Sequence, residues 1–213
     1  MTMSIRDINN EIREMILDTI NKVNEYRRVR IGISDIAKCL RYSYFSYLSP
    51  HKITDKTIIG IENHEVFVSV FSEVLENRGY ICEREMKIPG DIGARIDLYC
   101  VDSNAELHVY EFKFTSIPYK FNPYLQWYIR QLKYYMALVI RYEMKSRVYG
   151  HLVMVAHDFS AYDVWSEVMG REDAEKYLRE IEERAETLKR AKEGGPAPPP
   201  EKGPYCSSCP FRQ

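Results

Sequence analysis

The chain has 213 residues, of which 45% are hydrophobic, so it can build one substantial domain with a buried core and is not expected to be disordered. It carries 30 Lys and Arg against 31 Asp and Glu, a net charge of −1, which is not the balance of a protein that coats nucleic acid. No long apolar run and no signal-peptide pattern occur, so we expect no membrane contact and a cytoplasmic location.

Apolar positions recur at helical spacing in the first third of the chain. The second predicted helix begins with Ser34 or Asp35 as its N-cap, contains Cys39, and ends before Pro50. Gly79 follows the end of the third. The pattern predicts helices at residues 4–26, 34–49 and 58–78.

The hydrophobic period then changes to two, which indicates strands. The pattern predicts strands at residues 81–88, 94–101, 107–114 and 148–156, and helices at 122–142 and 171–192. A Gly- and Pro-rich linker follows from 194 to 204. We therefore predict a mixed α/β sheet flanked by helices. Its parts are a helical N-terminal region (1–80), a core (81–193), and a linker with a cysteine-containing tip (194–213) that docks on the N-terminal region.

Two acids and a lysine form the central chemical pattern. Glu111 and Lys113 are two apart on a predicted strand and so face the same way, with Phe112 packed behind and its carbonyl available. Asp97 lies on the preceding antiparallel strand, which a short turn brings alongside. Carboxylates are hard ligands for Mg²⁺ or Mn²⁺, and a lysine beside them can orient a water that attacks a phosphodiester.

A Glu-x-Lys triplet by itself is a weak signal, because the chain contains two others, at 85–87 and 143–145. The first has no acid on an upstream strand, and the second lies at the end of a helical pattern. Only Glu111-Phe112-Lys113 combines a strand with a strand-borne acid before it. The alternative is a solvated strand face with an ordinary salt bridge.

Together these residues resemble a known family. Asp97 with residues 111–113 is similar to the core motif of the PD-(D/E)XK nucleases, with their restriction-endonuclease-like sheet. Residues 60–64 resemble the Gly-x-x-x-His helix motif of the RecB-like branch, and residues 131–135 its Gln-x-x-x-Tyr motif. Read alone, these two could be a surface histidine and a helix packing pair. The resemblance implies that Lys113 serves the attacking water, that Gln131 and Tyr135 hold the site and the DNA backbone, and that the metal ligands are His64, Asp97, Glu111 and the carbonyl of Phe112.

The cysteines add a second pattern. Cys206 and Cys209 precede Pro210 at the spacing of a cluster-ligand run, and Cys39 lies near the other end of the chain. This arrangement around a RecB-like core resembles the CRISPR-associated RecB-like exonucleases (Cas family four), which implies an iron–sulfur cluster, [4Fe–4S] rather than [2Fe–2S]. A fourth cysteine ligand is not present and would be expected just beyond Gln213. Zinc on three thiolates is the alternative. The composition argues against disulfides, so Cys82 and Cys100 are read as buried apolar side chains.

The resemblance implies a metal-dependent exonuclease that acts on single-stranded DNA ends and trims fragments for CRISPR spacer acquisition. The implied partners are DNA and the CRISPR integrase complex, and a homo-oligomer is left open. Two alternatives remain: a stand-alone RecB-like repair nuclease, and a catalytically silent subunit that binds DNA ends.

Overall fold

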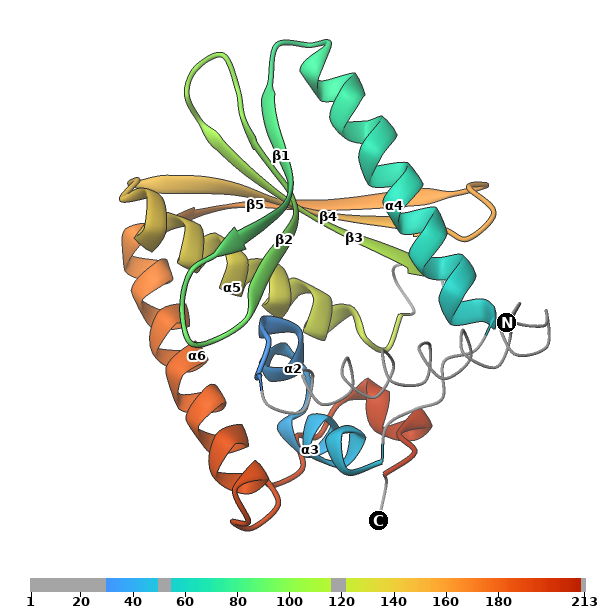
Figure 1. The fold of residues 1–213 in the computed structure, drawn as a ribbon, viewed down its shortest axis with the longest axis vertical. Coiled ribbons are helices and arrows are strands. Elements are labelled where there is room, and N and C mark those ends of the chain that lie inside the picture. The colour runs from blue at the N-terminus through green and yellow to red at the C-terminus, as the bar shows by residue number, and fades with distance from the viewer. Residues whose placement is uncertain (1–29, 50–54, 116–121, 212–213) are drawn as a thin grey trace, which may run out of the picture.

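A five-stranded mixed sheet forms the centre of the computed structural model, which describes residues 30–49, 55–115 and 122–211 (Figure 1). The predicted helix at 4–26 lies outside the described residues. The elements are α2 (Ile33–Ala37), α3 (Leu40–Leu48), α4 (Asp55–Glu76), β1 (Ile81–Ile88), β2 (Ala94–Val101), β3 (Leu107–Thr115), α5 (Leu125–Glu143), β4 (Arg147–Ala156), β5 (Tyr162–Gly170), α6 (Arg171–Lys192) and a short 3₁₀ turn (Pro204–Ser208).

The strands follow one another across the sheet in the order β1-β2-β3-β4-β5. All neighbours are antiparallel except β3 and β4, which are parallel and joined through α5. A parallel pair needs such a crossover, because the chain must return to the end of the sheet where the first strand began, and a tight turn only reverses its direction. The predicted α/β class with a mixed sheet is confirmed.

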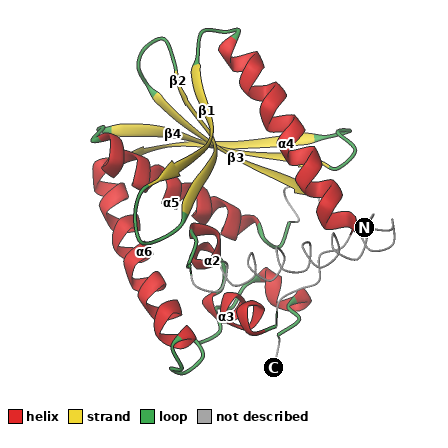
Figure 2. Cartoon of the chain, viewed as in Figure 1, coloured by secondary structure: helices red, strands yellow, loops and turns green. Residues whose placement is uncertain are grey.

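Helices cover both faces of the sheet (Figure 2). One face packs against α5, with α6 and α2 behind it, in a core that includes Ile33, Ile96 and Leu132. The other face packs against α4 through Phe112 and neighbouring aromatic side chains. The alternation along β3 therefore decides which helix each of its side chains meets.

Two predicted elements differ from the structure. The helix expected at 34–49 is broken: α2 ends at Ala37, Lys38 is extended, and Cys39 is the N-cap of α3 instead of an interior residue. The strand β5 was not predicted, because its outward-facing positions mix apolar and charged side chains, as is common on an edge strand. In the part of the chain that is described, none of the helices combines the length and the apolar character that a membrane crossing requires.

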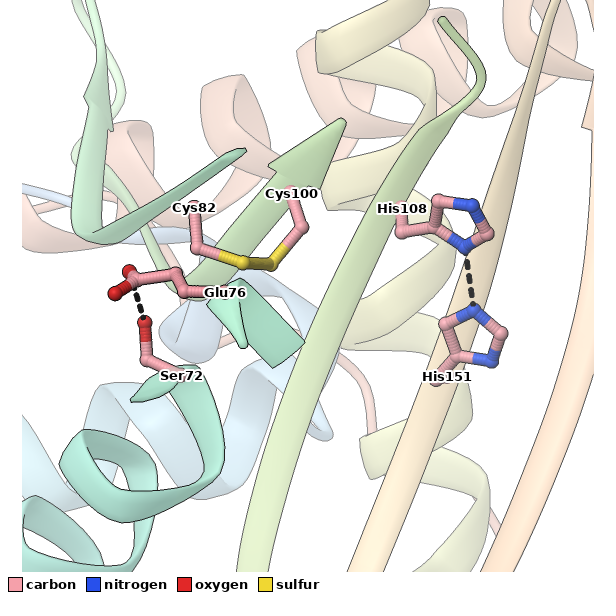
Figure 3. Close-up of a disulfide and its surroundings, with 6 residues drawn as sticks. All are labelled: Ser72, Glu76, Cys82, Cys100, His108 and His151. Atoms are coloured by element: carbon pink, nitrogen blue, oxygen red, sulfur yellow. Dashed lines mark hydrogen bonds between the residues drawn. A yellow bond between two sulfur atoms is a disulfide. The ribbon is translucent and has the colours of Figure 1, made fainter. Parts of the chain in front are cut away.

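The reading of Cys82 and Cys100 as separate buried thiols was wrong. They face each other in the β1–β2 register and form a disulfide (Figure 3). The hairpin itself brings them together, since positions equidistant from its turn lie opposite each other. An odd number of cysteines and a chain of this size argue against a network of disulfides, but they do not exclude one disulfide within a hairpin.

Reduction of this disulfide is expected to lower the free energy of unfolding by about 2–3 kcal/mol, because the bond closes a short loop in the unfolded chain. The measurement is urea unfolding with and without reductant, together with thiol labelling under denaturing conditions. Labelling should modify three cysteines before reduction and all five after it. Five reactive thiols in the unreduced protein would contradict the pairing.

Candidate active site

The site begins where the strand ladder around Asp97 opens. Pairing between β2 and β3 stops at Leu98 and Tyr110. One residue further, the backbone N–H of Phe112 donates to Asp97 Oδ2 at 2.9 Å, so a side chain takes the place of the next ladder bond. On the other side, the β1–β2 ladder pairs Arg84 with Leu98 and Met86 with Ile96 but skips Glu85, which lies opposite Asp97 and has a positive φ of 54°. Asp97 is thus held in a gap between strands, within reach of groups from both faces.

Glu111 and Lys113 lie on the α5 face of β3, as the alternation predicts, while Phe112 points into the α4 side. Glu111 is fully buried, and one of its oxygens, Oε1, accepts a hydrogen bond from Lys113 Nζ. The other oxygen, Oε2, is buried without a hydrogen-bond partner. A buried carboxylate oxygen with no donor is costly to a fold, so it marks a place where a ligand would be stabilising.

His64 reaches the same gap from α4. Its Nε2 lies 3.2 Å from Asp97 Oδ2, and its ring meets the rings of Phe112 and Phe114 edge-on. The hydrogen bond to Asp97 raises the pKa of His64 above its ordinary value. The Gly-x-x-x-His resemblance therefore leads to a histidine that contacts one of the two acids, and not to a surface position.

The two acids carry opposite perturbations. Burial raises the pKa of the Glu111 carboxyl to about 7, and the charge of Asp97 adds to the shift while Lys113 opposes it. Burial also disfavours ionisation of Asp97, but His64, Lys113 and the Phe112 N–H outweigh it, so that the pKa of Asp97 is lowered. Divergent pKa values of neighbouring carboxyls are typical of functional sites.

The described residues contain no group of three or more His, Cys, Asp and Glu side chains set to hold a metal ion. The potential ligands are instead engaged in two pairs, His64 with Asp97 and Lys113 with Glu111. The donor set still fits a hard or borderline divalent cation, since it offers carboxylate oxygens, an imidazole and an unpartnered Glu111 Oε2. A cation would balance these acids in place of protons, with Lys113 kept on Glu111 Oε1 and the free Oε2 open to the cation.

Gln131 and Tyr135 are one helical turn apart on α5 and hydrogen bond to each other, Nε2 to Oη, at 3.3 Å. Burial, and then the charges of Glu111 and Asp97, raise the pKa of Tyr135 well above its usual range. The pair therefore lies beside the acids. Tyr128, one turn earlier on the same helix, was missed by sequence reasoning; its ring is 5.3 Å from Lys113 Nζ. Its spacing of three residues from Gln131 was the available signal.

A cleft of about 590 Å³ opens on the other side of His64 and Asp97. It lies between α4 and β1, and its charged lining is one arginine, Arg84, against four acids: Glu65, Glu83, Glu85 and Asp97. This approach to the site is acidic. A phosphate backbone is consequently disfavoured there and favoured on the opposite side, where Lys113 lies.

The predicted cysteine ligands are brought partly together. Cys39 is buried in a cluster with Trp127 and Tyr205, against which Cys206 also packs, so the C-terminal tip contacts the N-terminal part. Cys39, Cys206 and Cys209 are free thiols. The cluster assignment stays a prediction.

The imidazole–carboxylate pair predicts a pH effect on the metal-free protein. A raised histidine pKa means that the pair stabilises the fold fully below the unfolded value of about 6.5, and that this stabilisation is lost as pH rises through the folded pKa. In EDTA, His64→Gln should therefore cost about 1 kcal/mol of unfolding free energy at pH 5.5 and less at pH 8.5. His157→Gln, at an exposed position, is the control. A deficit that does not vary with pH would contradict the pair.

The chain is similar to known proteins over most of its length. The family model for the PD-(D/E)XK nuclease superfamily matches residues 13–213. Among solved structures, SSO0001 is 16% identical with a TM-score of 0.48, and the match covers 89% of this chain and 93% of that one. An alkaline exonuclease (LHK-Exo) from Laribacter hongkongensis is 12% identical with a TM-score of 0.48, covering 81% and 95%. The structure of LHK-Exo in complex with dAMP is 14% identical with a TM-score of 0.48, and the match covers 79% of this chain and 92% of that one. No curated protein matches the chain.

Proposed function

The chain belongs to the PD-(D/E)XK nuclease superfamily, and we propose that it is a metal-dependent deoxyribonuclease that degrades single-stranded DNA from its ends. The observation that carries this proposal is Glu111, a fully buried carboxylate with one oxygen on Lys113 and the other without a partner. Glu167, paired with Lys133, also has such an oxygen, but only Glu111 lies beside a second carboxylate and a histidine, Asp97 and His64, in the described residues. A site for a hydrolytic cation requires such an oxygen.

In this proposal the cation is Mn²⁺ or Mg²⁺, and its ligands are Asp97, Glu111, His64 and the backbone carbonyl of Phe112. When bound, the cation polarises the phosphate and supplies an activated water. The gap in the ladder fixes Asp97, because the Phe112 N–H holds its carboxylate. The partial exposure of His64 leaves the Asp97 side of the site open to solvent.

Lys113 is the group that acts on the water and the phosphate. Its ammonium is held between Glu111 and the ring of Tyr128, so its position is defined before substrate binds. The charges of Glu111 and Asp97 outweigh burial and raise the pKa of Lys113, which keeps it a cation and a donor. It would orient the attacking water by a hydrogen bond and offset charge on the phosphate oxygens. Gln131 and Tyr135 support the acids from α5 and would hold the DNA backbone.

Single-stranded oligonucleotides labelled at one end or the other, incubated with Mn²⁺, Mg²⁺ or EDTA, test this function. Stepwise loss from one end in the presence of cation is the expected result. Internal fragments would replace the exonuclease proposal with an endonuclease. Binding without any cleavage would favour the alternative of a silent end-binding subunit.

The finer part of the proposal is a role in CRISPR spacer acquisition, in which the enzyme trims fragments for the integrase complex. It is supported by the cysteines that bracket the nuclease core, of which Cys39 and Cys206 lie in one cluster. The rival is a stand-alone repair nuclease. Co-purification with an integrase, tested with tagged protein, separates them: retention of the integrase supports the first, and its absence the second.

We further propose that Cys39, Cys206 and Cys209 hold an iron–sulfur cluster, favouring [4Fe–4S]. Three thiolates leave one position to another donor, and zinc is the alternative metal. An absorbance spectrum of anaerobically purified protein, with iron, sulfide and zinc analysis, decides between them. Visible absorption with iron and sulfide supports the cluster, and zinc or no metal overturns it.

A further inference from the structure

Lys38 is a cation without a partner at the edge of the candidate active site. It lies at the break between α2 and α3, and in the described part of the chain no hydrogen bond or ion pair ends on its ammonium group. Burial lowers its pKa, Asp35 opposes the shift, and the positive charge of Lys113 is near enough to lower the pKa further. The break lies against the first turns of α5, because Arg130 donates to the Ala37 carbonyl and Cys39 shares a cluster with Trp127, and Tyr128 of the same turns meets Lys113. Of the two lysines, only Lys113 has a carboxylate in hydrogen-bond contact.

The backbone that carries Lys38 is fixed by three long-range hydrogen bonds. Arg184 of α6 donates to the carbonyls of Ile36, at 2.6 Å, and of Lys38 itself, and Arg130 of α5 donates to that of Ala37 at 3.2 Å. The backbone of the α2–α3 break is therefore held by side chains of two other helices, and is not a loosely held turn. These hydrogen bonds fix the position of the Lys38 backbone, from which the side chain extends.

Asp35 does not neutralise Lys38 by direct contact. Its Oδ2 accepts the backbone N–H of Gly32 at 2.9 Å, which caps the start of α2. A half-buried ammonium that gains no ion pair costs stability, and such a cost persists where a ligand supplies the missing charge.

The surroundings identify the missing charge as a phosphate. Acids outnumber the single arginine, Arg84, along the approach between α4 and β1, whereas the Lys38 side carries two lysines and the ring of Tyr128. A strand that enters from this side meets cations for its backbone and an aromatic face on which a base can stack.

We propose that Lys38 binds a backbone phosphate of the DNA strand next to the phosphate that is cleaved. The inference rests on the proposed nuclease function and adds to it a subsite outside the acidic centre. The ligand is one phosphodiester anion, and it is recognised by charge and not by base sequence. Because the contact exists in the bound substrate before cleavage, it contributes to affinity and KM more than to kcat.

The test is binding of a fluorescent single-stranded oligonucleotide by anisotropy in EDTA, over a range of salt concentrations. Lys38→Met should weaken binding about tenfold, as for loss of one charge-assisted hydrogen bond. The slope of log affinity against log salt should become less steep by about 0.7. Lys38→Arg should retain most of the affinity. Lys176→Met, which removes an exposed lysine on α6, should match wild type.

A second readout separates binding from structure. Removal of an unpartnered half-buried cation should leave the melting temperature unchanged or raise it, whereas loss of a structural lysine would lower it. Oligonucleotides with a single neutral methylphosphonate linkage, scanned along the strand, should show one position that weakens wild type but not Lys38→Met. This scan also gives an answer with wild type and Lys38→Arg, if the methionine variant does not fold.

The outcomes distinguish the two levels of the proposal. If wild type binds and cleaves DNA but Lys38→Met keeps its affinity and salt slope, the subsite is wrong and the nuclease function stands. If wild type neither binds nor cleaves DNA, both are overturned. A fall in melting temperature without a change in affinity would assign Lys38 to the fold.

Discussion

Replacement of Lys113 by methionine is expected to reduce DNA cleavage about 10²–10⁴-fold, the range for loss of a group that orients or protonates at the reacting centre. Methionine keeps much of the volume between Glu111 and the Tyr128 ring but removes the donor. Both oxygens of the Glu111 carboxyl are then without a hydrogen-bond donor, and the pKa of Glu111, already about 7, should rise further. The measurement is initial cleavage rate with Mn²⁺ at saturating oligonucleotide.

The chain provides a matched control for this variant. Lys87 ends a second Glu-x-Lys triplet on β1 and is exposed. Lys87→Met removes the same charge from the same sequence pattern, and it should leave the cleavage rate at the wild-type value. Equal losses in the two variants would mean that Lys113 acts through net charge, and an active Lys113→Met would remove it from the mechanism. Melting curves of both proteins show whether the fold is kept.

The positions of Glu111 and Lys113 could be predicted because they depend on local order. Period-two alternation placed both on one face of β3, and the bounds of 81–88, 94–101 and 171–192 agree with β1, β2 and α6. The position of Asp97 beside them followed from a short hairpin turn. What could not be predicted is the opening of the ladder around Asp97, because it depends on a side chain competing with the backbone for one N–H.

Contacts between distant parts of the chain were also beyond the sequence. No pattern near Lys38 indicates that its ammonium approaches Lys113, since the approach depends on the break between α2 and α3. The disulfide is a different case. The predicted strands imply the hairpin register that pairs Cys82 with Cys100, and this local register decides the pairing, whereas the number of cysteines in the chain does not.

Glu201 is the clearest example of a contact that composition conceals. It lies in the Gly- and Pro-rich segment, which predicts a linker, yet its carboxylate accepts hydrogen bonds from Arg184 at 2.8 Å, Arg130 at 3.1 Å and the Leu40 backbone N–H at 3.0 Å. The same two arginines hold the carbonyls of residues 36–38. One carboxylate in the tail thus completes the network that positions Lys38 and Cys39.

Glu201→Ala is therefore expected to lower the free energy of unfolding by about 2–3 kcal/mol, because it leaves two largely buried arginines without their shared acid. The figure is at the low end for buried pairs, since the Glu201 side chain is 27% exposed. Urea unfolding measures the loss. Hydrogen exchange at the Leu40 amide, which loses its acceptor, should accelerate more than exchange at amides within β3.

The effect of Glu201 should also depend on pH with a defined sign. Burial opposes its ionisation, but the hydrogen bond and charge of Arg184 outweigh this, so the pKa of Glu201 is lowered. Its stabilisation is then fully present above the unfolded value of about 4.5 and is lost as pH falls through the folded pKa. The difference between Glu201→Ala and wild type should shrink in acid.

An exposed pair on α6 provides the comparison for Glu201. Glu186 lies 3.1 Å from Arg190 with both side chains more than half exposed, and Glu186→Ala should cost no more than about 0.5 kcal/mol. A loss as small as this for Glu201→Ala would mean that the arginines hold the α2–α3 break without the tail. A large loss, with faster exchange at Leu40 and weaker DNA binding, would show that the docked tail sets the geometry of the candidate active site.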